Sequence, residues 1–214
     1  MKAVLFDLDG TLLDTLADIA DCANRIRVEL GLPPHPRNAY RDFVGNGLKE
    51  LLMRALPARA LRGADLKKRA RRFEELYAKH GQDRTRPYPG VARMLDEVAR
   101  RGLPMGVVSN KPQRFTRQCV SELLPRWRFN VVRGSRPSQP LKPHPAGPLA
   151  AARAMGAKPS EVLYLGDTGV DMKAAAAAGM FPVGALWGFR DAKELKSCGA
   201  RVLIRRPEQL LELL

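Results

Sequence analysis

The feature that most constrains the fold is an acidic motif that directly follows a short apolar run near the N-terminus. Residues 3–6, Ala-Val-Leu-Phe, are all apolar, which is typical of a strand covered on both faces of a parallel sheet. Asp7 and Asp9 follow, and residues with this spacing point to the same side of an extended chain. Because open α/β sheets bind ligands beyond the carboxyl ends of their strands, we expect a functional site at this motif.

The two carboxylates predict chemistry on phosphate esters. Like charges this close are stable when a cation binds between them or when one carboxyl stays protonated. Asp7 is a candidate nucleophile that forms an aspartyl-phosphate, Asp9 is a candidate general acid/base, and the Thr11 hydroxyl is a candidate substrate contact. Mg²⁺ is the expected cofactor, because it prefers few carboxylates together with phosphate oxygens and water. The alternative interpretation is a surface turn with two ordinary aspartates.

Residues 15–84 are predicted to be helical, with no strand signal. In the first helix, residues 15–31, apolar residues at three- and four-residue spacing follow one face, and Thr15 with Asp18 predicts a capping box at its start. Further helices are expected over residues 38–44, 48–56 and 65–80. Since this stretch lies between one strand and the next βα unit, we predict an inserted helical cap domain over residues 15–84.

From residue 85 onward, predicted helices and strands alternate. Strands are expected over residues 105–108, 129–132, 162–165, 182–186 and 202–204. Helices are expected over residues 91–101, 114–124, 145–155, 171–179 and 192–197. This alternation predicts an α/β fold with a doubly wound, Rossmann-like parallel sheet, whose core domain comprises residues 1–14 and 85–214.

Other polar residues are expected at or near the ends of these strands. Ser109 and Asn110 follow the strand over residues 105–108, where a hydroxyl and backbone N–H groups can form a phosphate cradle. Asp167 and Asp171 follow a later strand and suit a hard cation, while Lys142, held just before a proline, can neutralise charge on a transferring phosphoryl group. A helix-capping Ser or Asp and a solvated Lys are the ordinary alternatives. Their shared position at strand ends predicts one site.

Composition limits the other classes of function. The formal net charge is +15, from 37 Lys and Arg against 22 Asp and Glu, so nucleic-acid binding must be considered. The basic residues are spread over the chain without a recognisable nucleic-acid-binding motif, which favours a solvated basic surface that attracts anionic metabolites. No apolar stretch is long enough to span a bilayer. With no signal-peptide pattern and three widely spaced cysteines, the expected location is the reducing cytoplasm.

The ordered set of motifs resembles the haloacid dehalogenase superfamily of aspartate-nucleophile phosphatases. Its four motifs match Asp7-x-Asp9-Gly10-Thr11, Ser109-Asn110, Lys142 and Gly166-Asp167-x-x-x-Asp171. The helical insertion resembles the small four-helix cap of the first subclass. Within that group the chain looks most like the phosphoglycolate phosphatases, through residues 44–47, 87–91, 109–112, 142–145, 178–180 and 187–188.

The resemblance implies a role for each matching residue. Asp7 would be the nucleophile and Asp9 the general acid/base, with Ser109 and Asn110 holding the phosphate and Lys142 balancing its charge. Mg²⁺ would be held by Asp7, by Asp9 through its main-chain carbonyl and by Asp167, with Asp171 supporting the metal or Lys142. Cap residues around Asn46 and Lys49 would close over the substrate. One departure is the basic loop over residues 134–137, where the family usually has an acidic residue.

Several functions remain open at this stage. The first is hydrolysis of a small phosphorylated metabolite such as 2-phosphoglycolate, by a monomer or homodimer. A sugar-phosphate mutase similar to β-phosphoglucomutase, a pyrophosphatase or a nucleotide phosphatase fits the same motifs, whereas Asp9 argues against a dehalogenase. In a different class, a basic nucleic-acid-binding protein on the same scaffold is disfavoured because all the catalytic side chains are present.

Overall fold

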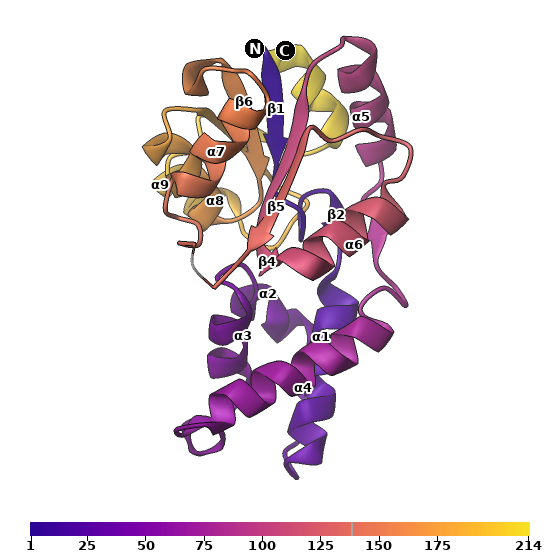
Figure 1. The fold of residues 1–214 in the computed structure, drawn as a ribbon, viewed down its shortest axis with the longest axis vertical. Coiled ribbons are helices and arrows are strands. Elements are labelled where there is room, and N and C mark those ends of the chain that lie inside the picture. The colour runs from indigo at the N-terminus through magenta and orange to yellow at the C-terminus, as the bar shows by residue number, and fades with distance from the viewer. Residues whose placement is uncertain (138) are drawn as a thin grey trace.

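A six-stranded parallel sheet forms the centre of the computed structural model, which describes residues 1–137 and 139–214 (Figure 1). The strands lie in the order β5-β4-β1-β6-β7-β8, and every neighbouring pair is parallel. They comprise β1 (Ala3–Phe6), β4 (Met105–Pro112), β5 (Val131–Ser135), β6 (Val162–Gly166), β7 (Phe181–Ala185) and β8 (Val202–Ile204). The expected α/β fold with a doubly wound parallel sheet is confirmed.

Helices cover both faces of the sheet, which explains the continuous apolar character of β1. Val4 and Phe6 pack on one face in a cluster with α5 (Val91–Arg100), α6 (Gln113–Leu123) and η4 (Pro207–Leu213). Ala3 and Leu5 face the other side, against α7 (Ala146–Ala154) and α8 (Gly169–Ala177). Two shorter helical segments, η3 (Pro159–Glu161) and α9 (Ala192–Ser197), lie before β6 and β8. Because strand residues alternate in direction, all four positions of β1 are fully buried.

The helical insertion lies beyond the carboxyl ends of β4 and β5, at the end of the molecule away from both termini (Figure 1). It is bracketed by β2 (Leu13–Asp14) and β3 (Arg86–Pro87), which pair antiparallel. Between them lie α1 (Leu16–Glu29), η1 (Arg37–Ala39), α2 (Tyr40–Phe43), α3 (Leu48–Ala55), η2 (Ala58–Leu61) and α4 (Asp65–His80). These helices share their own apolar cluster. We call residues 15–84 the cap and the remainder the core.

The predicted capping box at the start of α1 is wrong. Thr15 makes no side-chain capping hydrogen bond, and its buried Oγ1 has no hydrogen-bond partner among the described residues. Asp18, 2% exposed, instead accepts hydrogen bonds from the backbone N–H groups of Arg84 (3.0 Å) and Thr85 (2.8 Å) and from Thr85 Oγ1 (2.7 Å). Its carboxylate therefore joins the first turn of the cap to the segment by which the chain returns to the core.

Some strand boundaries also differ from expectation. The strand that ends at residue 108 in the sequence analysis continues to Pro112, so Ser109 and Asn110 lie within β4. Strand β5 is displaced toward its carboxyl end, at Val131–Ser135 instead of residues 129–132. In the described part of the chain, no helix is both long enough and apolar enough to traverse a lipid bilayer.

Candidate active site

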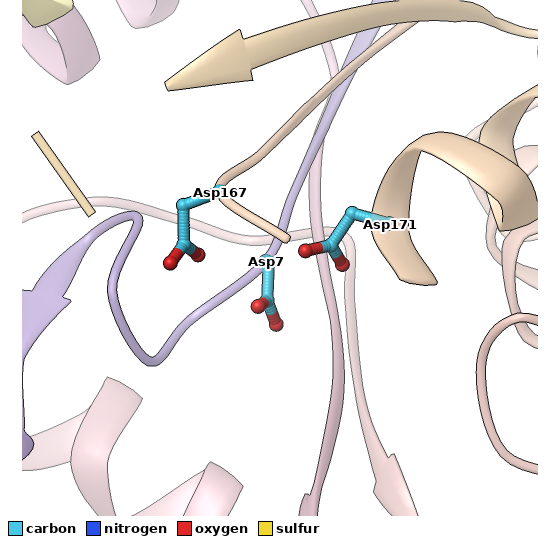
Figure 2. A group of neighbouring side chains, drawn as sticks. All are labelled: Asp7, Asp167 and Asp171. Carbon is cyan, nitrogen blue, oxygen red and sulfur yellow. The ribbon is translucent and has the colours of Figure 1, made fainter. Parts of the chain in front are cut away.

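Three aspartates distant in sequence meet at the carboxyl end of the sheet. Figure 2 shows the side chains of Asp7, Asp167 and Asp171 gathered beside one another, and one carboxylate oxygen from each lies within 4.8 Å of the others. Asp7 directly follows β1, Asp167 follows β6, and Asp171 lies in the first turn of α8. Because β1 and β6 are neighbours, with Phe6 opposite Leu165, the first two carboxylates are adjacent. We call these three residues the aspartate cluster.

Among the described residues, Lys142 is the positively charged residue whose side chain contacts the aspartate cluster. Its Nζ lies 2.8 Å from Asp7 Oδ1 and 2.6 Å from Asp171 Oδ1, and the side chain is 3% exposed. Burial opposes the charge of Lys142, but the attraction of Asp171 and Asp7 outweighs it and raises the pKa of the ammonium well above its usual value. One ammonium thus faces three buried carboxylates.

The pKa values of the aspartates reflect this excess of negative charge. Burial, followed by repulsion from Asp171, raises the pKa of Asp7 well above its usual value. The same two causes raise the pKa of Asp167 to about 7. Asp7 Oδ1 is buried, and Lys142 Nζ, 2.8 Å away, is the positive group that contacts it among the described residues. A hard divalent cation fits this set of carboxylate oxygens, because it would supply the missing positive charge.

The Asp167 carboxylate is held from two sides. Thr11 Oγ1 donates to Asp167 Oδ1 at 2.8 Å, and the backbone N–H of Phe189 donates to Oδ2 at 2.8 Å. Gly10 approaches closely, with φ +87°, and a Cβ at this position would lie 2.3 Å from Asp167 Oδ2. Thr11 is fully buried. The sequence analysis expected the Thr11 hydroxyl to contact a substrate. In this structure the hydroxyl instead positions the Asp167 carboxylate.

Asp171 fixes the ammonium group of Lys142. Its Oδ1 accepts from Lys142 Nζ, while Oδ2 accepts from the backbone N–H (3.0 Å) and Oγ1 (2.6 Å) of Thr168 in a capping box at the start of α8. Lys142 Nζ also donates to the Val108 carbonyl at 2.9 Å. Of the two roles that the resemblance implied for Asp171, this geometry provides the support of Lys142. The helix-capping alternative is present as well.

Ser109 and Asn110 lie beside the aspartate cluster but differ in what their side chains can do. Ser109 Oγ accepts from the Lys111 N–H at 3.2 Å, which leaves its own proton free to donate. The Asn110 amide donates to the carbonyls of Gly45 and Lys142, both at 3.0 Å, and accepts from the Lys142 N–H at 2.9 Å. The Asn110 side chain therefore braces a cap loop against the Lys142 loop, and both of its amide protons are used.

A cavity with about 550 Å³ of empty space, part of it open to solvent, lies between the cap and the carboxyl end of the sheet. Its polar wall includes Asp7, Asp9, Ser109, Asn110 and Lys111. Its apolar side chains come mostly from the cap and comprise Ile19, Val44, Leu48, Leu51, Phe73, Tyr77 and Phe115, together with Pro112. We call it the catalytic cavity. Its lining therefore combines polar groups, all from the core, with apolar side chains that come mostly from the cap.

Asn46 and Lys49 are not among the residues that line the catalytic cavity. With its amide turned to satisfy its neighbours, Asn46 Oδ1 accepts a hydrogen bond from Arg54 at 2.7 Å. The Lys49 side chain is exposed. The cap residues that contact the cavity are instead the apolar set above and the glycines at positions 45 and 47, and contact of Asn46 or Lys49 with substrate stays a prediction.

Lys111 is a site residue to which the sequence analysis assigned no role. Its Nζ lies 2.7 Å from Asp9 Oδ1, with the two side chains 5% and 11% exposed, and 4.6 Å from the centre of the Tyr77 ring. Burial opposes its charge, but attraction to Asp9 outweighs burial and raises the pKa of the ammonium. The sequence places Lys111 two residues after Ser109, but the sequence analysis ended the strand at residue 108, whereas β4 continues to Pro112 and carries both residues.

Comparisons with known proteins agree with this geometry. A family model described as haloacid dehalogenase-like hydrolase matches residues 4–185. The phosphoglycolate phosphatase of Chromobacterium violaceum is 34% identical over 100% of this chain and 96% of its own. The N-acetylmuramic acid 6-phosphate phosphatase of Pseudomonas aeruginosa is 32% identical over 100% and 95%. A crystal structure described as a predicted phosphoglycolate phosphatase from Haemophilus somnus superposes with a TM-score of 0.91 at 26% identity, over 100% and 97% of the two chains.

Proposed function

Because this chain belongs to the haloacid dehalogenase-like hydrolase family, we propose that it is a Mg²⁺-dependent phosphatase that hydrolyses small phosphomonoesters through an aspartyl-phosphate on Asp7. The observation that carries the proposal is the aspartate cluster together with Lys142, whose Nζ lies 2.8 Å from Asp7 and 2.6 Å from Asp171. The names of several relatives favour 2-phosphoglycolate as the first substrate to test.

In the first step, a carboxylate oxygen of Asp7 attacks phosphorus. A bond forms between this oxygen and phosphorus, and the bond from phosphorus to the ester oxygen breaks. The leaving oxygen takes a proton from Oδ2 of a neutral Asp9 carboxyl, whose Oδ1 accepts from Lys111. Lys142 lies beside Asp7 and balances negative charge on the transferring group. The Ser109 hydroxyl, which lines the catalytic cavity, donates to a phosphate oxygen.

In the second step, water attacks phosphorus and displaces Asp7. Asp9, now a carboxylate, accepts a proton from this water, the acyl phosphate bond breaks, and inorganic phosphate leaves with the Asp7 carboxylate restored. The cap packs over the site, and its apolar side chains limit the entry of other water molecules during the first step.

Asp7, Asp167 and the main-chain carbonyl of Asp9 are the groups that we expect to hold Mg²⁺. When bound, the ion supplies positive charge to the phosphoryl oxygens. The Asp167 carboxylate is already held in place by hydrogen bonds from the Thr11 hydroxyl and the Phe189 N–H. Asp171 is occupied with Lys142 and Thr168 and therefore acts mainly on the position of Lys142.

A screen of phosphate release with and without Mg²⁺ tests the proposal. The panel contains 2-phosphoglycolate, N-acetylmuramic acid 6-phosphate, β-glucose 1-phosphate, a nucleoside monophosphate and pyrophosphate. Asp7→Asn should abolish release, whereas Asp9→Asn should reduce it roughly 10²–10⁴-fold. Asp14→Asn is the matched control, because Asp14 is exposed and does not line the catalytic cavity. Turnover by Asp7→Asn at the wild-type rate would falsify the proposal.

The same screen separates the alternatives. A mutase would isomerise the sugar phosphate and release little free phosphate. A nucleic-acid-binding protein would show no turnover on any substrate, and its affinity for nucleic acid would fall steeply with salt.

A further inference from the structure

One stretch of the chain carries basic residues at the ordinary density for this protein but has no acidic residues to balance them. Residues 123–160 contain no Asp or Glu. They contain seven Lys and Arg residues, which are Arg126, Arg128, Arg133, Arg136, Lys142, Arg153 and Lys158. These 38 of 214 residues therefore account for seven of the fifteen net positive charges. The catalytic steps above use one of them, Lys142.

Part of this stretch encloses a second cavity, which we call the basic pocket. It has about 710 Å³ of empty space, part of it open to solvent, and lies between β4, β5, the loop before α7 and α7 itself. Four cationic or protonatable residues line it, namely Arg133, Lys142, His144 and Arg153, and no Asp or Glu among the described residues does. Ser109 and Asn110 line both this pocket and the catalytic cavity, so the two cavities share a wall.

The two guanidinium groups of the basic pocket lack acidic partners. Neither Arg133 nor Arg153 forms an ion pair with any described residue, whereas other arginines do, such as Arg72 with Glu29 at 2.5 Å. Arg133 donates to the side-chain oxygen of Gln139 at 3.0 Å, which uses one of its five N–H donors. Uncompensated cations in a concave site focus the electrostatic potential and attract anions.

His144 provides a further donor. Its Nδ1 is 3.2 Å from the Ala146 N–H and accepts from it, so the proton of the neutral ring lies on Nε2. Lys142 adds little of its own charge to the pocket, because its Nζ is engaged with Asp7 and Asp171 on the catalytic side. The donors on the pocket side are thus the two guanidinium groups and the imidazole.

We propose that the basic pocket is a second anion-binding site, distinct from the catalytic cavity, that takes a phosphate group. Guanidinium groups present paired donors that match the oxygens of a phosphate. The volume leaves room for a phosphate group attached to a small organic body, so the source is either inorganic phosphate or a phosphorylated metabolite. This site does not depend on the proposed catalytic activity.

Titration with inorganic phosphate in EDTA tests the proposal. Without a divalent cation, the aspartate cluster repels phosphate, so saturable binding at neutral pH and constant ionic strength reports the basic pocket. Arg133→Gln combined with Arg153→Gln should weaken binding about tenfold or more, because two charged donors are lost. Arg128→Gln combined with Lys158→Gln removes the same charge from exposed positions that do not line the pocket, and binding should change less than about twofold.

Each outcome decides between the possibilities. The absence of saturable phosphate binding to the wild-type protein, or equal weakening in both double variants, would overturn the proposal. A phosphorylated metabolite that binds more tightly than inorganic phosphate, and is weakened by the same pocket variant, supports a site for the larger ligand. Equal affinity supports inorganic phosphate. An oligonucleotide that displaces phosphate and binds both double variants equally would assign the charge to nucleic acid and overturn the site.

Discussion

Lys111 Nζ lies 2.7 Å from Asp9 Oδ1, and the same ammonium lies 4.6 Å from the centre of the Tyr77 ring. Lys111 belongs to β4 of the core, whereas Tyr77 belongs to α4 of the cap. The candidate acid/base is thus held by a buried lysine that also packs against the cap. This contact links the position of the Asp9 carboxylate to the packing of α4 on the core.

Replacing Lys111 should impair Asp9 more than it impairs binding. We expect Lys111→Met to lower kcat about 10–100-fold on an alkyl phosphate, with a small effect on KM, because a poor leaving group needs a well-placed acid. On p-nitrophenyl phosphate, whose leaving group needs little protonation, the loss should be within about threefold. Steady-state kinetics on both substrates measure the difference.

Two further variants make the Lys111 result specific. In the double variant with Asp9→Asn, Lys111→Met should cause no additional loss on the alkyl phosphate, since the group that it positions is already disabled. Lys79→Met is the matched control on α4, because Lys79 is exposed. An equal loss on both substrates, or an additive loss in the double variant, would contradict a positioning role.

Gly10 is predicted to tolerate no side chain. Both Gly10 and Gly31 have positive φ, +87° and +69°, but a Cβ on Gly10 would lie 2.3 Å from Asp167 Oδ2, whereas a Cβ on Gly31 meets nothing within 4 Å. Gly31→Ala should therefore lower the free energy of unfolding only by the cost of placing alanine in a left-handed backbone conformation, about 1–2 kcal/mol. This variant should retain turnover. Gly10→Ala should cost more and displace Asp167, with loss of Mg²⁺-dependent activity. Chemical denaturation and phosphate release measure the two effects, and wild-type turnover by Gly10→Ala would contradict the expectation.

In the absence of divalent cations, the free energy of unfolding should decrease as the pH rises. Burial and then Asp171 raise the pKa of Asp167 to about 7, and burial also raises the pKa of Asp7. The folded state therefore binds more protons than the unfolded state at intermediate pH. By linkage, this stability is complete below about pH 4 and is lost as the pH rises through about 7. The raised pKa values of Lys111 and Lys142 act only at higher pH.

Thermal unfolding in EDTA and in Mg²⁺ at several pH values measures this linkage. The increase in Tm that Mg²⁺ produces should grow with pH, because the metal binds deprotonated carboxylates. Asp167→Asn should flatten the pH dependence in EDTA. A Mg²⁺ effect on Tm that is constant across the range would show that the aspartate cluster does not hold the cation.

Asp18 should contribute strongly to stability through the junction of cap and core. It accepts hydrogen bonds from the backbone N–H groups of Arg84 and Thr85 and from Thr85 Oγ1 at 2% exposure. Asp18→Ala would remove the acceptor of both backbone N–H groups, whereas the Thr85 hydroxyl would keep its bond to the Gly81 carbonyl. We expect a loss of about 3 kcal/mol or more of unfolding free energy. Asp21→Ala, which removes an exposed partner of the same Arg84, should cost less than about 1 kcal/mol. Equal losses in urea denaturation would argue against the buried junction.

The sequence alone was sufficient for the fold class, the family and the identity of the clustered side chains. The apolar run before Asp7 and the alternation of strands and helices after residue 85 depend on local periodicity, which a buried parallel sheet imposes directly. The family resemblance is confirmed by the comparisons. Asp7, Lys142, Asp167 and Asp171 were recognisable because they follow strands that end at the same edge of the sheet.

The tertiary structure alone decided how those side chains are used. Thr11 serves Asp167, Asn110 joins Gly45 to the Lys142 loop, and Lys111 holds Asp9. Each contact joins segments between 32 and 156 residues apart. The physical reason is that a buried polar group must find a partner wherever packing places one. Local pattern reveals the polar group, whereas the partner is determined by which strands and loops become neighbours in the folded chain.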